Sequence, residues 1–479
     1  MVMYAYYIIC IPHTLQKNAL KPQPLPPPCP FTPVQLLVFF LQLLPRRALR
    51  QLPALQGKGF YNRLFSPLVT LWYLLFQRLN PDHSLDAALA DARAGGGDSL
   101  NRKLSRKLLS GSTSSYSDAR QRLPWEFLAQ VLHLQGRKIT ALSPSALWKG
   151  LVVALLDGST VRLRPYHNIP QEFTPQRNQH HQRPYWCLMR LAVNFCCFTG
   201  AALDCAMGSM QASEQALGCE IILRAWPRCL FVGDRNFGVF RIVQAIREKK
   251  HQLLVRLTDA RARKLLGRAL RLGDHPVTWT ASPHDQLERT LRKDPVQGRL
   301  LVVQLKRPGF RSQRISLFTT LVDPVQYRME QLVELYGLRW HIELDLRYVK
   351  SQMESRQLEA HSADCARKEW LATLLAYNLI RAAMLCAALQ KGISPLTLSF
   401  SASRRRLEHW LCQFGRNKTS AGASWKRTLD EISKCLLPQR AKPRPAEPRA
   451  QRHLREPYPP LVGSRAQARK KRLHKQAKS

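Results

Sequence analysis

The chain has 479 residues, 45% of them hydrophobic, and a mean hydropathy of −0.28. These values exclude a mainly membrane-embedded or wholly disordered protein and leave room for two or three folded domains. Lys and Arg number 74 against 32 Asp and Glu, a formal net charge of +42, and so large an excess repels itself unless a polyanion such as nucleic acid neutralises it.

The first 145 residues predict a leader followed by a helical domain. The leader, residues 1–32, contains a cluster of prolines and is expected to be disordered. Residues 33–145 are interpreted as a helical DNA-binding domain, although their basic side chains also fit solvated helix faces. Ser66 and Pro67 occupy the N-cap and first-turn positions of one helix, and a second helix is expected over 117–134. The apolar side chains of the first helix recur on one face, at Leu68, Leu71, Trp72, Leu75 and Leu79.

Residues 151–257 predict an α/β core. The unbroken apolar run Leu151–Leu156 is typical of a buried strand. Strands on either side of the turn Thr199-Gly200 follow, and then helices and strands alternate. This order predicts a mixed sheet. The further strands are expected at 190–198, 201–207, 229–232 and 252–255, and the helices at 214–225 and 240–247.

The remaining residues predict an insertion, a return to helix and a tail. Residues 258–320 are polar, contain Pro and Gly, and alternate like antiparallel strands near their end, which indicates a β-rich insertion. Residues 321–390 return to the core as helices, and residues 391–438 form a helical C-terminal region. Residues 439–479 are rich in Pro, Arg and Lys, so we expect a disordered basic tail that contacts phosphates or merely increases solubility.

The cysteines indicate the redox compartment. There are 12, and none forms a Cys-x-x-Cys pair, so the sequence contains neither a zinc ribbon nor a thioredoxin motif. His180, His181 and Cys187 resemble metal ligands but lack a fourth partner. Reduced, buried thiols and a cytoplasmic protein are therefore expected. The apolar run Val34–Leu44 is too short to cross a membrane as a helix, and no membrane association is predicted.

Two aspartates follow apolar strands of the expected core. Asp157 comes directly after the run Leu151–Leu156, and Asp234 follows the strand expected over 229–232. Active sites of α/β proteins form at this carboxyl edge of the sheet. A single aspartate in such a place is more often a turn residue or a helix N-cap. Two of them after neighbouring strands favour a catalytic site.

The helix expected over 325–351 carries a polar stripe. Four residues are spaced by three, four and seven positions, and these steps return to one face of a helix. They are Tyr336, Arg339, Glu343 and Lys350. The alternative is an ion pair between Arg339 and Glu343 on a solvated helix. Apolar residues beside the stripe indicate that the helix packs closely on the protein, which favours a stripe at the edge of a cleft.

These motifs resemble those of a known enzyme family. The segments Asp157-Gly158-Ser159-Thr160 and Asp234-Arg235-Asn236-Phe237, and the pattern Tyr-x2-Arg-x3-Glu-x6-Lys at 336–350, are similar to those of the DDE transposases of bacterial insertion sequences. The last pattern resembles the YREK signature of the insertion sequence four family. The resemblance extends from Phe65 to Arg381 and implies an α/β, ribonuclease H-like catalytic core that encloses the β-rich insertion. Shorter similar segments lie at 273–275, 307–311 and 375–381.

The resemblance implies a three-carboxylate site. Asp157, Asp234 and Glu343 would be catalytic and would bind two Mg²⁺ or Mn²⁺ ions, with Asp157 bridging both of them. Such ions activate a water for cleavage and neutralise the leaving oxygen. The freed 3′-OH can then attack a second phosphodiester in the same site.

Five further residues are predicted to contact DNA. Arg339 and Lys350 would bind phosphates beside the cut. Tyr336 would bond a phosphate or stack near a flipped base. Trp279 is a candidate stacking platform, with a core tryptophan as the more frequent alternative. Arg235 would contact DNA or, with equal weight, form a structural ion pair.

The sequence thus predicts a bacterial transposase. It would bind double-stranded DNA at the terminal inverted repeats of an insertion sequence and at target sites, and cut and rejoin it by a cut-and-paste route. We expect a homodimer in the synaptic complex, associated with the nucleoid in the cytoplasm. The alternatives are an inactive or repurposed DNA-binding protein and a ribonuclease H-like nuclease without strand transfer. An RNA-associated protein is disfavoured because no RNA-binding signature is evident.

Overall fold

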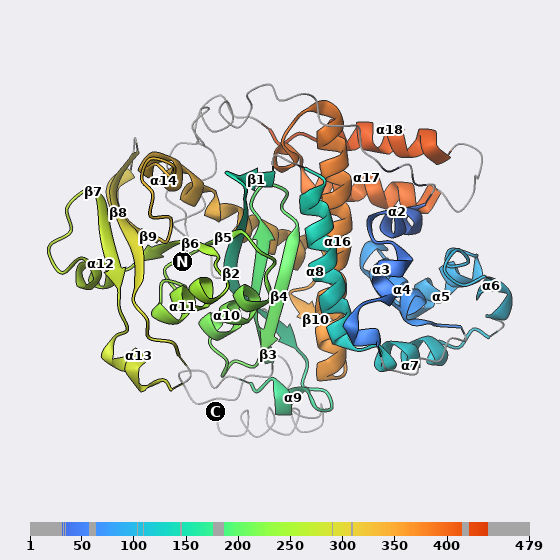
Figure 1. The fold of residues 1–479 in the computed structure, drawn as a ribbon. Coiled ribbons are helices and arrows are strands. Elements are labelled where there is room, and N and C mark those ends of the chain that lie inside the picture. The colour runs from blue at the N-terminus through green and yellow to red at the C-terminus, as the bar shows by residue number, and fades with distance from the viewer. Residues whose placement is uncertain are drawn as a thin grey trace, which may run out of the picture.

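A ten-stranded mixed sheet crosses the molecule in the computed structural model, and helices pack on both of its faces (Figure 1). The predicted α/β class is therefore confirmed. The structure describes residues 31, 33, 35–56, 64–102, 104–108, 110–143, 146–175, 186–289, 291–307, 310–413 and 421–438. The leader and the basic tail, which were predicted to be disordered, lie outside these ranges apart from Phe31.

The parallel strands lie in the middle of the sheet. Eight strands lie side by side in the order β4 (Ala202–Gly208), β3 (Cys187–Cys196), β2 (Leu151–Leu163), β5 (Cys229–Gly233), β6 (Gln252–Leu257), β9 (Phe310–Thr319), β8 (Val296–Arg307) and β7 (Gly273–Trp279). The neighbours β2, β5 and β6 are parallel, and the other pairs in this row are antiparallel. Because β9 pairs with β6, the predicted insertion extends the core sheet. Two short strands, β1 (Leu147–Trp148) and β10 (Gln357–Leu358), pair with β2.

Two helical layers cover the sheet. One face packs against α10 (Glu214–Arg224) and α11 (Phe240–Glu248), and the other against α8 (Trp125–Ala141), α15 (His341–Arg347) and α16 (Ala363–Lys391). The long helices α8 and α16 lie side by side between the sheet and the N-terminal helices (Figure 1). Among the described residues, α16 alone has the length and hydropathy of a membrane span, but its most apolar window is entirely buried. That burial is typical of a core helix.

The helical N-terminal region agrees with the prediction except at one proline. α4 (Pro67–Leu79) begins directly after Ser66, as expected, although it is buried on nearly all sides and not on one face. The helix predicted over 117–134 is two helices, α7 (Ser114–Arg122) and α8. They are separated at Pro124, because proline has no N–H and its ring disfavours helical geometry in the residue before it. The other helices of the two terminal regions are α2 (Leu36–Leu43), α3 (Arg46–Arg50), α5 (Leu85–Arg93), α6 (Leu104–Lys107), α17 (Phe400–Gln413) and α18 (Ala421–Ser433).

The prediction of one continuous helix over 325–351 is wrong in its start and its regularity. The Asp323 carboxylate accepts hydrogen bonds from the backbone N–H groups of Val325 and Gln326, at 2.8 and 3.0 Å, and these bonds hold a turn in place of helix. Segments of different winding follow, namely α14 (Met329–Gly337), the 3-10 turn η3 (Leu338–Trp340), α15 and the π-helical turn η4 (Tyr348–Gln352). Interruptions of this kind within a helix often mark functional positions.

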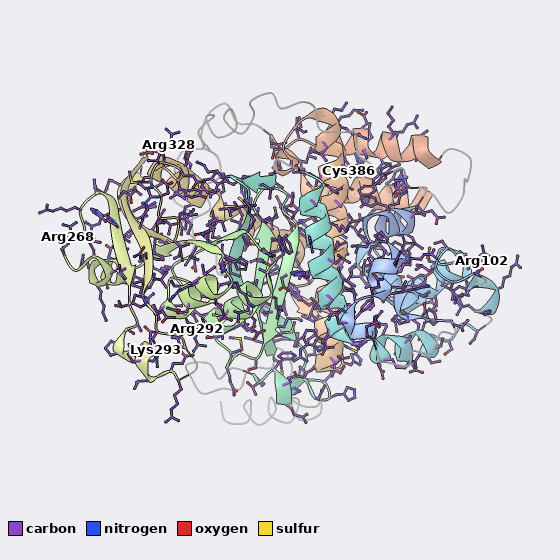
Figure 2. All side chains as sticks on the ribbon, viewed as in Figure 1. Arg102, Arg268, Arg292, Lys293, Arg328 and Cys386 are labelled. Atoms are coloured by element: carbon purple, nitrogen blue, oxygen red, sulfur yellow. The ribbon has the colours of Figure 1, made fainter. Side chains whose placement is uncertain are left out.

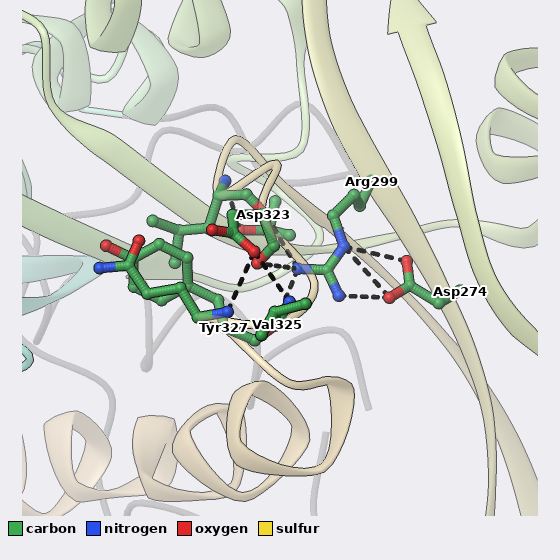
Figure 3. A network of polar contacts seen from close by, with 8 residues as sticks. Asp274, Arg299, Asp323, Val325 and Tyr327 are labelled. Atoms are coloured by element: carbon green, nitrogen blue, oxygen red, sulfur yellow. Dashed lines mark hydrogen bonds and ion pairs between the residues drawn. The ribbon is translucent and has the colours of Figure 1, made fainter.

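A buried arginine connects the insertion to the turn before α14 (Figure 3). Arg299 of β8 donates to both carboxylate oxygens of Asp274 in β7. Its Nη1 also donates to the carbonyl oxygens of Leu321, Asp323 and Tyr327, at 3.0, 3.3 and 2.8 Å. The Arg299 side chain is only 4% exposed. The insertion therefore fixes the path of the chain into the helix that carries the polar stripe.

Candidate active site

Asp157 lies inside β2 and not after its end, which corrects the sequence prediction. β2 continues to Leu163, because β3 offers antiparallel partners along this whole length. The parallel pairing of β2 with β5, however, stops at Leu156 and Gly233. Asp157 and Asp234 each follow directly after this last parallel pair. The two aspartates are therefore at the edge where the sequence predicted them, although only Asp234 ends its strand.

Arg339 joins the helix to the strand end. Its Nη2 donates to Glu343 Oε1 at 2.8 Å, and its Nη1 lies 3.8 Å from Asp157 Oδ2. The Arg339 side chain is 12% exposed. The ion pair that was the alternative explanation of the stripe therefore forms, but it is not on a solvated helix face. It contacts a third charge on the sheet.

Burial and neighbouring charges raise the pKa values of Asp157 and Glu343. Burial raises the pKa of Asp157 to about 7; the charges of Asp234 and Glu343 add to this rise, and Arg339 opposes it. Burial also raises the pKa of Glu343, with a further rise from the charge of Asp234 and an opposing effect from Arg339. The ion pairs of Arg339 place Asp157 of β2 beside Glu343 of α15.

These acids do not form a ready-made metal cage. Within the described parts of the chain, no group of three or more His, Cys, Asp or Glu side chains is close enough together to hold a metal ion. Arg339 supplies the positive charge between Asp157 and Glu343. The donor chemistry nevertheless fits a hard divalent cation, because carboxylate oxygens are the ligands that Mg²⁺ prefers and the carboxyl pKa values are raised.

Lys350 and Tyr336, the other members of the predicted stripe, also act on this cluster. Burial lowers the pKa of Lys350 to about 8, the charge of Arg356 adds to the shift, and Asp157 opposes it. Burial disfavours the charged form of Arg339. The effects of Tyr336, Glu343 and Asp157 outweigh that of burial, so the pKa of the guanidinium is raised. The four stripe residues thus lie near one end of the parallel strands.

The two remaining predicted DNA contacts differ in their surroundings. Arg235 is exposed on the turn after β5. Trp279 is 7% exposed, and its ring contacts Phe318 edge-on with 4.7 Å between ring centroids. This burial leaves no ring face for a base to stack on and supports the alternative of a core residue. The prediction of a stacking platform is therefore corrected for Trp279.

Sequence analysis does not identify a buried ion pair beside the stripe. Asp345 of α15 pairs with Arg381 of α16, and both side chains are 3% exposed. Tyr377, one turn before Arg381, accepts from Arg381 Nε at 2.7 Å and lies 3.0 Å from Asp345 Oδ1. The i, i+4 spacing of Tyr377 and Arg381 is the one sequence signal that could have indicated this network. Its acidic partner is 36 residues away along the chain.

Comparison with known proteins identifies the family. A family model described as "Transposase DDE domain" matches residues 148–379, a range that contains Asp157, Asp234 and Glu343. This part of the chain therefore resembles transposase DDE domains. The chain is also 28% identical, over 301 residues, to the transposase InsG for insertion sequence element IS4 of Escherichia coli (strain K12). Together the two matches confirm the resemblance to DDE transposases of the insertion sequence four family.

The matches differ in extent. The alignment to the IS4 transposase covers 60% of this chain and 65% of the relative, so it spans slightly less than two thirds of the relative's length. A cryo-EM structure of the piggyBac transposase synaptic complex with hairpin DNA is 11% identical and has a TM-score of 0.40, with 86% of this chain and 87% of that chain covered. The DDE domain itself is therefore identified by sequence.

Positive side chains are spread over the surface and are not confined to the candidate site (Figure 2). Arg268, Arg292 and Lys293 lie on the insertion, and Arg102 lies at the opposite end of the molecule among the N-terminal helices. Arg328 is exposed directly before α14.

Proposed function

We propose that the chain is a DNA transposase, which cuts and joins double-stranded DNA at the terminal inverted repeats of an insertion sequence. One observation carries the proposal. Arg339 contacts both Asp157 and Glu343, and the charge of Asp234 raises the pKa values of these two acids. Three carboxyl groups from two strand ends and one helix therefore act on a single region of a transposase DDE domain.

The core of this domain is proposed to be of the ribonuclease H type. The strand order supports this assignment. Three antiparallel strands, β4, β3 and β2, are followed by the parallel strands β5 and β6. Such an arrangement places the first and fourth core strands side by side, and the two aspartates directly follow the last parallel pair between them.

Asp157, Asp234 and Glu343 are proposed to bind two Mg²⁺ or Mn²⁺ ions. When bound, such ions activate water and neutralise the oxygen that leaves phosphorus. The protein's own contribution is to bring the carboxylates together and to set the pKa of Asp157. Arg339 holds Asp157 and Glu343 near one another, and the Asp157 carboxyl, with a pKa of about 7, releases its proton readily near neutral pH.

DNA is proposed to approach along the polar stripe. Arg339 and Lys350 would bind phosphates, Tyr336 would contact a phosphate or an unstacked base, and Arg235 is exposed beside Asp234. The net charge of +42 would favour binding to target DNA as well. Two DNA ends require two active sites in one complex, so we propose a homodimer that works on DNA of the nucleoid in the cytoplasm.

The test is cleavage of a labelled duplex that carries the DNA segments flanking the coding sequence of this chain. Wild type is compared with Glu343→Gln in Mg²⁺ and in EDTA. We expect nicking at the element end in Mg²⁺ only, reduced on the order of 100-fold or more in Glu343→Gln. The matched control is Glu330→Gln, an exposed acid on α14, which should cut like wild type.

The alternatives give different results. Cleavage without end joining would indicate a nuclease of the same fold. Salt-dependent binding with no cleavage by any variant would contradict the proposal and favour a DNA-binding protein without catalysis. Cleavage that persists undiminished in Glu343→Gln would contradict the assignment of this acid.

A further inference from the structure

A fourth carboxylate, Glu214, lies beneath the turn that carries Asp234. Successive residues of a strand point to opposite faces of its sheet, so Asp157 faces α15 and Gly158 faces α10. A Cβ atom at position 158 would lie 2.4, 2.6 and 2.7 Å from Cδ, Oε2 and Oε1 of Glu214. No unbonded carbon approaches a carboxyl group so closely. Glycine at position 158 therefore leaves the space that the Glu214 carboxyl occupies.

Glu214 is connected to Asp234 through one asparagine. Asn236 Nδ2 donates to Glu214 Oε2 at 2.5 Å. At the other end of the amide, Gln215 Nε2 donates to Asn236 Oδ1 at 2.7 Å, so both polar atoms of the amide are fixed. The backbone N–H of Asn236 then donates to Asp234 Oδ1 at 2.8 Å. The start of α10 therefore holds the residue that orients the Asp234 carboxylate.

We propose that Glu214 is a positioning residue for Asp234. It accepts from Asn236, and Asn236 in turn fixes one oxygen of the Asp234 carboxylate. The inference rests on the proposed function, because the orientation of Asp234 matters only if this residue binds the catalytic cations. Groups that orient the ligands of a metal ion in this way typically contribute tenfold to about 100-fold to metal affinity or activity.

A simpler account of Glu214 is that an acid in the first turn of a helix stabilises that helix. This account explains the charge but neither the bond to Asn236 nor the space left at Gly158. The two accounts separate in Glu214→Gln. Glutamine loses the charge but keeps an oxygen that can accept from Asn236 Nδ2.

The experiment measures metal binding as well as cleavage. Mn²⁺ is titrated into the complex of the full chain with its end DNA, and free Mn²⁺ is followed by its electron paramagnetic resonance signal. Cleavage rates are measured in parallel as a function of Mg²⁺ concentration. The matched control is Glu220→Ala, an exposed acid of the same helix that pairs with Arg224.

Glu214→Ala should weaken Mn²⁺ binding by about tenfold to 100-fold and raise the Mg²⁺ concentration for half-maximal cleavage by a similar factor. DNA affinity should stay unchanged. Glu214→Gln should restore Mn²⁺ binding to within about threefold of wild type, because one such bond is preserved. Glu220→Ala should behave like wild type.

Gly158→Ala provides a second, independent variant. It keeps every carboxylate but displaces the Glu214 carboxyl from Asn236, and should weaken Mn²⁺ binding as Glu214→Ala does. In the double variant, alanine at position 214 leaves room for the added carbon, so the two effects should not add. The measurement on Gly158→Ala tests the positioning role of Glu214 even if Glu214→Ala folds poorly.

The outcomes separate the two proposals. If wild type neither cuts DNA nor binds Mn²⁺, the proposed function fails and the role of Glu214 falls with it. If wild type does both, and Glu214→Ala and Gly158→Ala leave Mn²⁺ binding unchanged, only the positioning role is overturned. A loss in Glu214→Ala that Glu214→Gln does not restore would also overturn it.

Discussion

Glu343 and Asp345 lie two residues apart on α15, and each pairs with an arginine in a different environment. Glu343 pairs with Arg339 and is 34% exposed, whereas Asp345 pairs with Arg381 and is 3% exposed. On its other side, Arg339 of the first pair faces a third charge, that of Asp157.

Aromatic rings enclose the pair of Asp345 and Arg381. The Arg381 guanidinium lies over the rings of Tyr348, Tyr377 and Phe400, at 5.6, 5.3 and 5.4 Å from their centroids.

We infer that burial, and not the kind of residue, separates the structural pair from the pair that we propose to be functional. The buried pair has an aromatic hydroxyl as a further partner and connects α15 to α16. The half-buried pair lies beside Asp157, and burial and the charge of Asp234 raise the pKa values of Asp157 and Glu343. We therefore expect changes at the Asp345 pair to affect folding and changes at the Glu343 pair to affect chemistry.

The largest expected effect is loss of the buried pair. Asp345→Ala leaves the Arg381 charge buried without its partner and should lower the free energy of unfolding by about 3–5 kcal/mol. Urea denaturation followed by circular dichroism measures this change. The control is Asp294→Ala, since Asp294 pairs with Arg247 at an exposed site and should contribute less than about 1 kcal/mol. Equal losses in the two variants would contradict the comparison.

The next largest effect is expected at Gly200, in the turn between β3 and β4, which lies beside Arg381. Gly200 has a φ of +69°, and a Cβ there would lie 2.7 Å from Arg381 Cζ. Gly200→Ala should therefore lower the free energy of unfolding by about 2–3 kcal/mol, from backbone strain and from displacement of a side chain that cannot move.

Gly267→Ala is a matched control for this prediction. Gly267 has a φ of +68°, but a Cβ there would have no neighbour within 4 Å. Its substitution should cost only the strain of about 1 kcal/mol. The difference between the two variants, measured by the same denaturation, isolates the contact with Arg381. No difference would show that this contact does not matter.

Much of the fold follows from local sequence. Apolar runs such as Leu151–Leu156 locate the core strands, because buried strands need apolar residues on both faces. The extension of β2 past Asp157 has no such signal. The segment after it is polar, and it forms a strand only because β3 provides backbone partners across the sheet. The irregular helix of the stripe was missed for a similar reason, since its start depends on hydrogen bonds that the Asp323 carboxylate accepts from the backbone.

In the candidate site too, some residues follow from local sequence and others do not. The i, i+4 spacing of Arg339 and Glu343 was enough to predict that they lie on one face of a helix. The resemblance to a family added the link from these residues to the two aspartates. Glu214 could not be predicted, since its partners lie on two other segments of the chain and no local pattern connects them. Residues that orient a site from the opposite face of the sheet can be recognised only in the three-dimensional structure.

A smaller effect is expected at Asp157, and it should have the opposite sign. In the folded protein its pKa is about 7, above the value of about 4 in an unfolded chain, so the folded state binds the proton more tightly. The stability of the metal-free protein should therefore fall as pH rises from about 4 to 7. Asn cannot ionise, so Asp157→Asn should be about 1–2 kcal/mol more stable than wild type at pH 8.

Thermal unfolding of the metal-free protein in EDTA, from pH 4 to pH 8, measures this difference. The advantage of Asp157→Asn should become small near pH 4, where the folded carboxyl is protonated and the unfolded one is about half protonated. Mg²⁺ should also reduce the advantage, because cation binding stabilises the wild-type carboxylate. A variant less stable than wild type at pH 8 would show that Arg339 outweighs burial at this site.

The smallest expected change in stability is at Glu343, the residue whose loss should affect cleavage most. Its partner Arg339 also contacts Asp157, so Glu343→Gln leaves no buried charge unpaired and removes a charge that raises the pKa of Asp157. The free energy of unfolding at pH 7.5 should therefore stay within about 0.5 kcal/mol of wild type. Urea denaturation of Glu343→Gln beside Asp345→Asn provides the sharpest comparison, because both replace an acid by its amide two positions apart. Loss of several kcal/mol only in Asp345→Asn would support the division, whereas comparable losses would show that Glu343 too is part of the framework of the fold.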